Sequence, residues 1–80
     1  MKVKIRYFGQ FRDFTGKREE ILETKNGITV EEIKEKIRDK FPKIAAKNEI
    51  LVAVNGSFGS LDQVILETDE VAFFPPVSGG

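Results

Sequence analysis

ITVEEIKEKIRDKF, residues 28–41, carries the strongest helix signal in the chain. Thr29 is a favoured N-cap residue, and Glu32 follows three positions later, which is the pattern of a capping box. Apolar residues then recur every three or four positions, so they share one face of a helix. These residues are Val30, Ile33, Ile37 and Phe41. Charged residues cover the other face, and Pro42 predicts the end of the helix.

The segments on either side of this helix predict β-strands. The first eight residues alternate, with Val3, Ile5 and Tyr7 on one face, as expected of a strand with one buried face. Asn55-Gly56 predicts a tight hairpin turn. Strands are expected at residues 1–8, 18–24 (a charged edge strand), 50–55, 57–60 and 71–74. One amphipathic helix covers only one face of such a sheet. The sequence therefore predicts an α+β fold, with four or five strands packed on one main helix and one open face.

Two connections are less regular. Residues 10–17 predict a loop with one helical turn, and its two aromatic residues, Phe11 and Phe14, are expected to hold it against the core. Residues 43–49 predict a polar connection in which Ile44 is buried.

Four aromatic residues fall near one end of the predicted sheet. They are Tyr7, Phe8, Phe73 and Phe74. A core built on a single helix is thin, so these four rings cannot all point into it. We therefore predict an exposed apolar patch where the chain leaves the last strand, with Phe73 and Phe74 as candidate partner-contact residues.

The last six residues predict an extended tail outside a domain of residues 1–74. They are Pro75, Pro76, Val77, Ser78, Gly79 and Gly80. Adjacent prolines keep the chain extended and withhold two N–H donors. Glycines let another protein close around the backbone. Such a tail reaches roughly 20 Å at about 3.3–3.6 Å per residue. It either presents its terminal carboxylate to a partner or is an ordinary frayed end.

The amino-acid composition limits which partners and which kinds of reaction this chain is expected to have. Eighty residues support one small domain, and thirteen basic residues balance thirteen acidic ones, so no overall field attracts nucleic acid or an anionic membrane. No apolar run is long enough to span a bilayer and no signal peptide opens the chain, so we expect a cytoplasmic protein. The chain has no cysteine and no histidine. It therefore lacks the commonest general base, thiol nucleophile and metal ligands, which argues against an enzyme that works alone and against a metal site.

DEVAFFPPVSGG, residues 69–80, resembles the C-terminus of the MoaD-like sulfur carriers, the small subunits of molybdopterin synthase. Residues 2–8 look like the first strand of that family, residues 12–16 like its next loop and residues 54–56 like its central hairpin. A Gly-Gly ending is common to ubiquitin-like proteins, whereas PPVSGG directly after an aromatic strand is more specific. Residues 66–69 depart from the family, which more often has a glycine in this turn. The resemblance implies a β-grasp (ubiquitin-like) fold with a mixed sheet, whose first and last strands lie side by side.

The resemblance also implies a function. In that family an ATP-dependent activating enzyme adenylates the terminal carboxylate, here that of Gly80, which is then converted to a thiocarboxylate. The large subunit of molybdopterin synthase takes in the tail, and the sulfur passes to cyclic pyranopterin monophosphate. On this chain Pro75, Pro76, Val77 and Ser78 would be the threaded stretch, and Gly79 the spacer that permits close approach. The chain itself would bind no cofactor, because ATP is used by the activating enzyme.

The residues support the same chemistry independently. Without cysteine the chain cannot carry sulfur as a side-chain persulfide, whereas its α-carboxylate can be activated by AMP and displaced by a sulfur nucleophile. Ser78 has no base near it in sequence, which favours a hydrogen-bonding or small-residue role. Two alternatives remain open: a ubiquitin-like modifier joined to lysines through Gly80, and a non-catalytic binding module. The Pro-Pro pair argues against a thiamine-type sulfur carrier.

Overall fold

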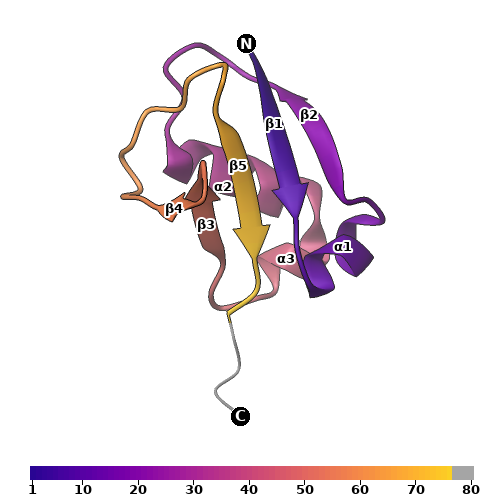
Figure 1. Cartoon of the computed structure of the whole chain (residues 1–80). Coiled ribbons are helices and arrows are strands. Elements are labelled where there is room, and N and C mark those ends of the chain that lie inside the picture. The colour runs from indigo at the N-terminus through magenta and orange to yellow at the C-terminus, as the bar shows by residue number, and fades with distance from the viewer. Residues whose placement is uncertain (77–80) are drawn as a thin grey trace.

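The computed structural model describes residues 1–76, which form five strands and three helices. In chain order these are β1 (Lys2–Tyr7), α1 (Gln10–Thr15), β2 (Glu19–Glu23), α2 (Val30–Lys40), α3 (Pro42–Ala45), β3 (Leu51–Val54), β4 (Ser57–Phe58) and β5 (Glu70–Phe74). Helix α2 lies across one face of the sheet, while α1 and α3 lie beside each other near the end of β1 (Figure 1). The predicted α+β class is confirmed.

The five strands form one mixed sheet in the order β2-β1-β5-β3-β4. Strand β1 runs parallel to β5, and the other neighbours are antiparallel. The first and last strands are therefore adjacent at the centre of the sheet, as the family resemblance implies. Tyr7 pairs with Phe73 in this register, so both side chains enter the core. The sheet order also places β2 at one edge, as its charged sequence predicts.

Helix α2 begins as its sequence predicts. The Thr29 hydroxyl accepts the Glu32 backbone N–H at 3.2 Å, and the Glu32 carboxylate accepts the Thr29 backbone N–H at 3.2 Å. This capping box satisfies two donors that the first helical turn leaves free. Pro42 ends the helix, but it also opens α3, because proline suits the first position of a helix. The expectation of an irregular connection over residues 43–49 is therefore wrong at its start, where α3 forms, although Ile44 is buried as predicted.

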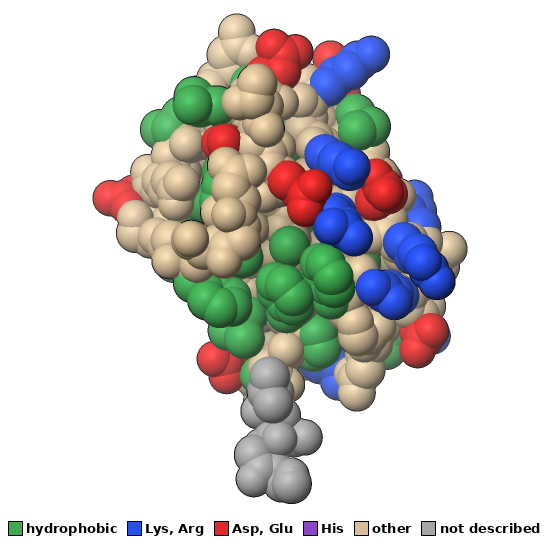
Figure 2. Space-filling view, viewed as in Figure 1, with side chains coloured by type: hydrophobic (Ala, Val, Ile, Leu, Met, Phe, Trp, Pro, Cys, Tyr) green, Lys and Arg blue, Asp and Glu red, His purple; other side chains and the backbone are tan. Residues whose placement is uncertain are grey.

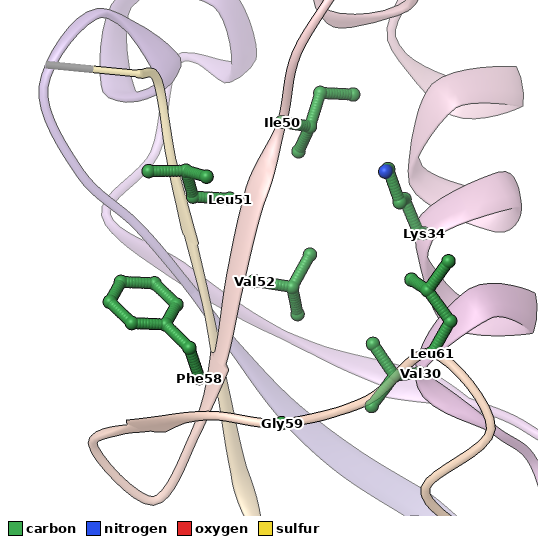
Figure 3. Close-up of a pocket in the computed structure, with 8 residues that line it drawn as sticks. All are labelled: Val30, Lys34, Ile50, Leu51, Val52, Phe58, Gly59 and Leu61. Atoms are coloured by element: carbon green, nitrogen blue, oxygen red, sulfur yellow. The ribbon is translucent and has the colours of Figure 1, made fainter.

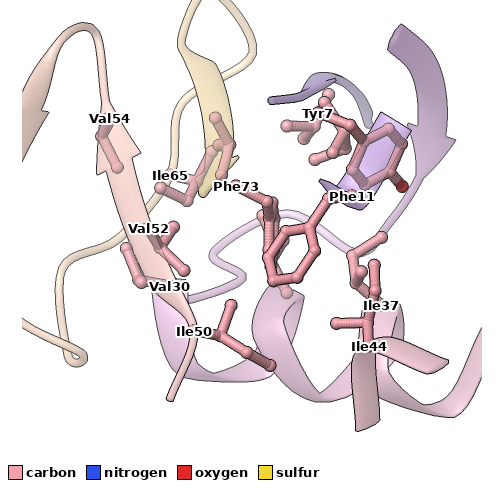
Figure 4. Close-up of a cluster of buried hydrophobic side chains, with 14 of the residues drawn as sticks. Tyr7, Phe11, Val30, Ile37, Ile44, Ile50, Val52, Val54, Ile65 and Phe73 are labelled. Atoms are coloured by element: carbon pink, nitrogen blue, oxygen red, sulfur yellow. The ribbon is translucent and has the colours of Figure 1, made fainter. Parts of the chain in front are cut away.

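The core lies between α2 and the sheet (Figure 4). Its largest fully buried side chains come from both layers and from α1 and α3: Tyr7, Phe11, Phe73, Ile5, Ile28, Ile33, Ile37, Ile44 and Ile65. Residues 59–69 form no strand, and only Ile65 of their apolar residues is buried. The Ile65 backbone N–H donates to the Ile28 carbonyl at 2.8 Å, which ties this segment to the start of α2.

A buried carboxylate joins the first two strands to α2. The Glu20 side chain, 9% exposed, accepts hydrogen bonds from the Tyr7 hydroxyl and the Lys40 ammonium, and Lys17 lies 3.6 Å away. Burial alone would raise the pKa of Glu20, but the hydrogen bonds from Lys40 and Tyr7 and the charges of Lys40 and Lys17 outweigh it and lower that pKa. Burial, together with the hydrogen bond to Glu20 and its charge, raises the pKa of Tyr7.

We expect Glu20→Gln to lower the free energy of unfolding by about 1–2 kcal/mol at pH 7, because it removes a buried charge that three groups stabilise. A carboxyl group whose pKa is lower in the folded than in the unfolded protein stabilises the fold at pH values above its unfolded pKa. That stabilisation is lost as the pH falls through the folded pKa. The gap between wild type and Glu20→Gln should therefore close in acid. Urea unfolding at pH 7 and below pH 4 measures it. Glu19→Gln, at an exposed pair with Lys4, is the control and should change little. A gap that persists in acid would contradict this account.

Candidate functional site

Three aromatic rings gather on the open face of the sheet, next to the last described residues. Phe8 and Phe74 stack with their centroids 4.6 Å apart, and Phe58 lies edge-on to Phe74 at 6.1 Å. Phe58 is 67% exposed, and the other two are half-buried. Figure 2 shows hydrophobic side chains, in green, gathered on this face toward the end of the molecule where the described residues end. We call Phe8, Phe58 and Phe74 the aromatic cluster.

The strand pairing explains why these three residues meet. Asn55 and Gly56 both have positive φ, as the two-residue hairpin turn that the sequence predicts requires. That turn pairs Ala53 with Phe58, so the Phe58 side chain lies on the open face. Phe74 pairs with Leu51 on the same face, and Phe8 continues β1 beside β5. The cluster is therefore built from three separate parts of the chain.

Two guanidinium groups lie over the Phe8 ring. Arg6 Cζ is 5.1 Å from the ring centroid and Arg12 Cζ is 5.5 Å from it. Arg12 is held by a hydrogen bond from its Nε to the Tyr7 carbonyl at 3.1 Å, and Arg6 by an ion pair with Glu70 at 3.3 Å. Each contact is a cation–π interaction. The cluster thus has an apolar centre and a cationic margin, which suits a protein surface with aliphatic and acidic residues.

Phe74 lies on the exposed apolar patch that the sequence predicts, whereas Phe73 does not. That this patch contacts a partner stays a prediction. Phe73 is 0% exposed and lies in the core, 6.2 Å from the Tyr7 ring. The core accommodates both Tyr7 and Phe73. The Tyr7 ring lies edge-on to Phe41 at 5.7 Å, and its hydroxyl reaches Glu20, so its polar end needs no place among the apolar side chains. Phe8 and Phe58, which complete the surface, were not among the predicted contact residues. The Asn-Gly turn register was the signal that could have placed Phe58.

The base of the tail is anchored at the aromatic cluster. Pro75 is half-buried, and its ring lies against Gly9: a Cβ added to Gly9 would be 3.2 Å from Pro75 Cγ. Gly9 has a φ of 58°, which glycine adopts readily, and it sits at the N-cap of α1. Pro76 is exposed. Val77, Ser78, Gly79 and Gly80 lie outside the described residues, so their predicted roles stay predictions.

The described residues hold no arrangement typical of catalysis on a bound metal. Within residues 1–76 no three Asp or Glu side chains come together as a metal site would require. Across the same range, none of the helices has the length and apolar character needed to cross a bilayer.

Comparison with known proteins gives consistent matches. A model of the ThiS family matches residues 5–80. The molybdopterin synthase sulfur carrier subunit of Mycobacterium tuberculosis is 35% identical over 83 residues, covering 100% of this chain and 99% of that protein. A Pyrococcus furiosus structure, assigned as molybdopterin converting factor subunit 1, superimposes with a TM-score of 0.88 at 32% identity, covering 96% of this chain and 99% of that one. The crystal structure of SAMP1 from Haloferax volcanii, at 24% identity, covers 100% of both chains with a TM-score of 0.85, which shows a shared fold.

Proposed function

Because this chain belongs to the ThiS family, and is related along its whole length to sulfur carrier subunits, we propose that it is the sulfur carrier subunit of a molybdopterin synthase. It is then the sulfur-donating small subunit of a two-subunit sulfurtransferase, and its partner supplies the catalytic groups. The observation that carries the proposal is the full-length relationship, at 35% and 32% identity, to proteins of this one kind.

The chemistry takes place on the terminal carboxylate of Gly80. A carboxylate oxygen attacks the α-phosphorus of ATP and pyrophosphate leaves, which makes an acyl adenylate. A sulfur nucleophile then attacks the acyl carbon and AMP leaves, so a poor leaving group has been replaced by a good one. When the nucleophile is a persulfide, the first product is an acyl disulfide, and a thiol then cleaves its S–S bond to give the thiocarboxylate and a disulfide with the donor. Hydrosulfide gives the thiocarboxylate directly. The thiocarboxylate sulfur attacks a carbon of cyclic pyranopterin monophosphate and an oxygen substituent of that carbon leaves. Water then cleaves the acyl–sulfur bond, which leaves the sulfur on the pterin and restores the carboxylate of Gly80. No side chain of this subunit needs to act as a base.

The folded part of the chain serves as the docking surface for these reactions. The aromatic cluster lies beside Pro75, so a protein bound over it receives the tail at its own surface. Aromatic residues and arginine are the types that dominate binding energy in protein interfaces. We assign this surface to the large synthase subunit and, in turn, to the ATP-dependent activating enzyme, both in the cytoplasm. One carrier cannot present one tail to both at once, so the two partners compete.

Intact-mass measurement tests the proposal. The full chain is incubated with a cognate activating enzyme, ATP and a sulfur donor, and its mass should rise by the replacement of one oxygen with sulfur. The loaded chain, mixed with the large subunit and the cyclic pterin, should return to its original mass. If no sulfur-loaded species forms under any of these conditions, the proposal fails. Gly80 joined to target lysines instead would identify a protein modifier.

Gly79→Val tests whether the tail must enter a narrow channel. We expect the variant to fold as wild type does, because the described core ends before this residue. Sulfur delivery should fall at least about 100-fold, since a branched side chain would displace the reacting carbonyl by an ångström or more. Single-turnover transfer from a semisynthetic, already thiocarboxylated chain measures this step alone. Gly79→Ala is the matched control and should lose less. Transfer at the wild-type rate by Gly79→Val would rule out a tight channel.

A further inference from the structure

The β3 edge of the sheet is only half covered. Strand β4 has two residues and pairs with β3 at Ala53 and Val54 alone. The Asn55 backbone N–H donates to Glu70 of β5 at 2.9 Å, so alternate β3 residues, including Leu51 and Ala53, direct their backbone groups toward β5. Val52 therefore turns its backbone N–H to the outer edge, beyond the stretch that β4 pairs.

A hollow of about 220 Å³ lies beside this uncovered edge, between β3 and α2. Figure 3 shows Ile50 and Val52 pointing toward α2 across the hollow, with Val30 and Leu61 opposite and Lys34 at its margin. A cavity of about 150 Å³ lined by aliphatic side chains holds a benzene ring, so this one accommodates a whole aliphatic side chain. Leu61 is half-exposed here, which leaves its side chain available to an incoming group.

This edge lacks the protection that the opposite edge has. Strand β2 carries three glutamates in its five residues, and charged side chains discourage pairing with other chains. The uncovered stretch at Ile50, Leu51 and Val52 carries no charge. Within residues 1–76, Lys34 forms no ion pair, so its ammonium is available to an acidic group.

The hollow is continuous with the aromatic cluster. Phe58 belongs to the cluster and also lines the hollow, together with Leu51 on the same face. A partner seated over the cluster therefore reaches the β3 edge without leaving the surface.

We propose that the large subunit adds an extended segment to the free edge of β3, with an aliphatic side chain in the hollow and a carboxylate on Lys34. This inference rests on the proposed function for the identity of the partner. Side chains of an added strand alternate, so one set enters the hollow beside Val30 and the next lies on Leu51 and Phe58. Main-chain hydrogen bonds then hold the carrier in one orientation while its tail is used.

Residue-resolved amide exchange of the intact chain, free and bound to the large subunit, tests the inference. The Val52 amide should exchange at least about tenfold more slowly in the complex, because its hydrogen bond forms only there. The Leu51 and Ala53 amides, paired with β5, should be protected in both states and serve as internal references. Unchanged exchange at Val52 in a fully formed complex would overturn the proposal.

Two variants give a second measurement. Lys34→Glu and Leu61→Asp should each raise the Kd for the large subunit at least about tenfold, by like-charge contact and by loss of the apolar contact. Lys36→Glu reverses a charge on the exposed face of the same helix and should leave the Kd unchanged. Equal binding by all three overturns the inference while the proposed function stands. If the free chain dimerises and its Val52 amide is already protected from exchange, the β3 edge binds a second copy of this chain instead of the large subunit. Failure of wild type to bind the large subunit at all overturns the proposed function as well.

Discussion

A chain that ends at Ser78, with Gly79 and Gly80 deleted, is expected to lose sulfur loading completely and to fold like the full-length protein. The chain has no cysteine, so no side chain can take over the role of the terminal glycine carboxylate. A carboxylate at Ser78 would stop short of the activating enzyme's nucleotide by two residues, about 7 Å of extended chain. Loading, read by intact mass, should fall below detection.

The fold of this variant should be unaffected, because every core residue lies in the described part of the chain before Pro75. Its free energy of unfolding in urea should stay within about 0.5 kcal/mol of wild type. Ser78→Ala is the control: it keeps the length and the glycine end, and should load sulfur normally if Ser78 has no nucleophilic role. Normal loading by the truncated chain would show that the carried group is elsewhere.

Local patterns in the sequence were sufficient for the elements that local chemistry controls. Thr29 and Glu32 identify the start of α2, Asn55-Gly56 the hairpin, and the alternation of Val3, Ile5 and Tyr7 the buried face of β1. Helix α3 was missed because four residues are too few to show a periodic pattern. The sequence predicts the short strand β4. Only the strand pairing shows that β4 leaves half of β3 uncovered.

The candidate site depended on contacts between distant residues. Neighbouring residues of a strand face opposite sides, so Phe73 and Phe74 lie on opposite faces of β5, yet the alternation does not say which face is buried. The parallel register that pairs Tyr7 with Phe73 decides this, and it joins residues more than sixty positions apart. The same register brings Phe8 onto Phe74. Gly79 and Gly80 were identified by family resemblance, since their chemistry depends on what the terminus does in a partner.

Phe74→Asp is expected to weaken binding to the large subunit at least about 30-fold while leaving the chain folded. The Phe74 ring stacks on Phe8 and meets Phe58 edge-on, so it is the central member of the aromatic cluster. An aspartate there removes the apolar contact and places an unpaired carboxylate in the interface, a loss of 2 kcal/mol or more for a residue at the centre of an interface. Each factor of ten in Kd corresponds to about 1.4 kcal/mol.

Stability and binding must be measured on the same variants to separate the two faces of β5. Phe74 faces the open side and is half-buried, so loss of its stacking should cost about 1 kcal/mol of folding free energy. Phe73→Asp should unfold the chain, because that side chain is 0% exposed. Ile21→Asp, at a site 59% exposed on the same open face but across the sheet in β2, should leave the Kd unchanged. Calorimetric titration of Phe74→Asp and Ile21→Asp gives the Kd, and urea unfolding gives their stability and shows whether Phe73→Asp folds at all. A folded Phe74→Asp chain that binds as tightly as wild type would mean that the partner reaches the tail without covering the aromatic cluster.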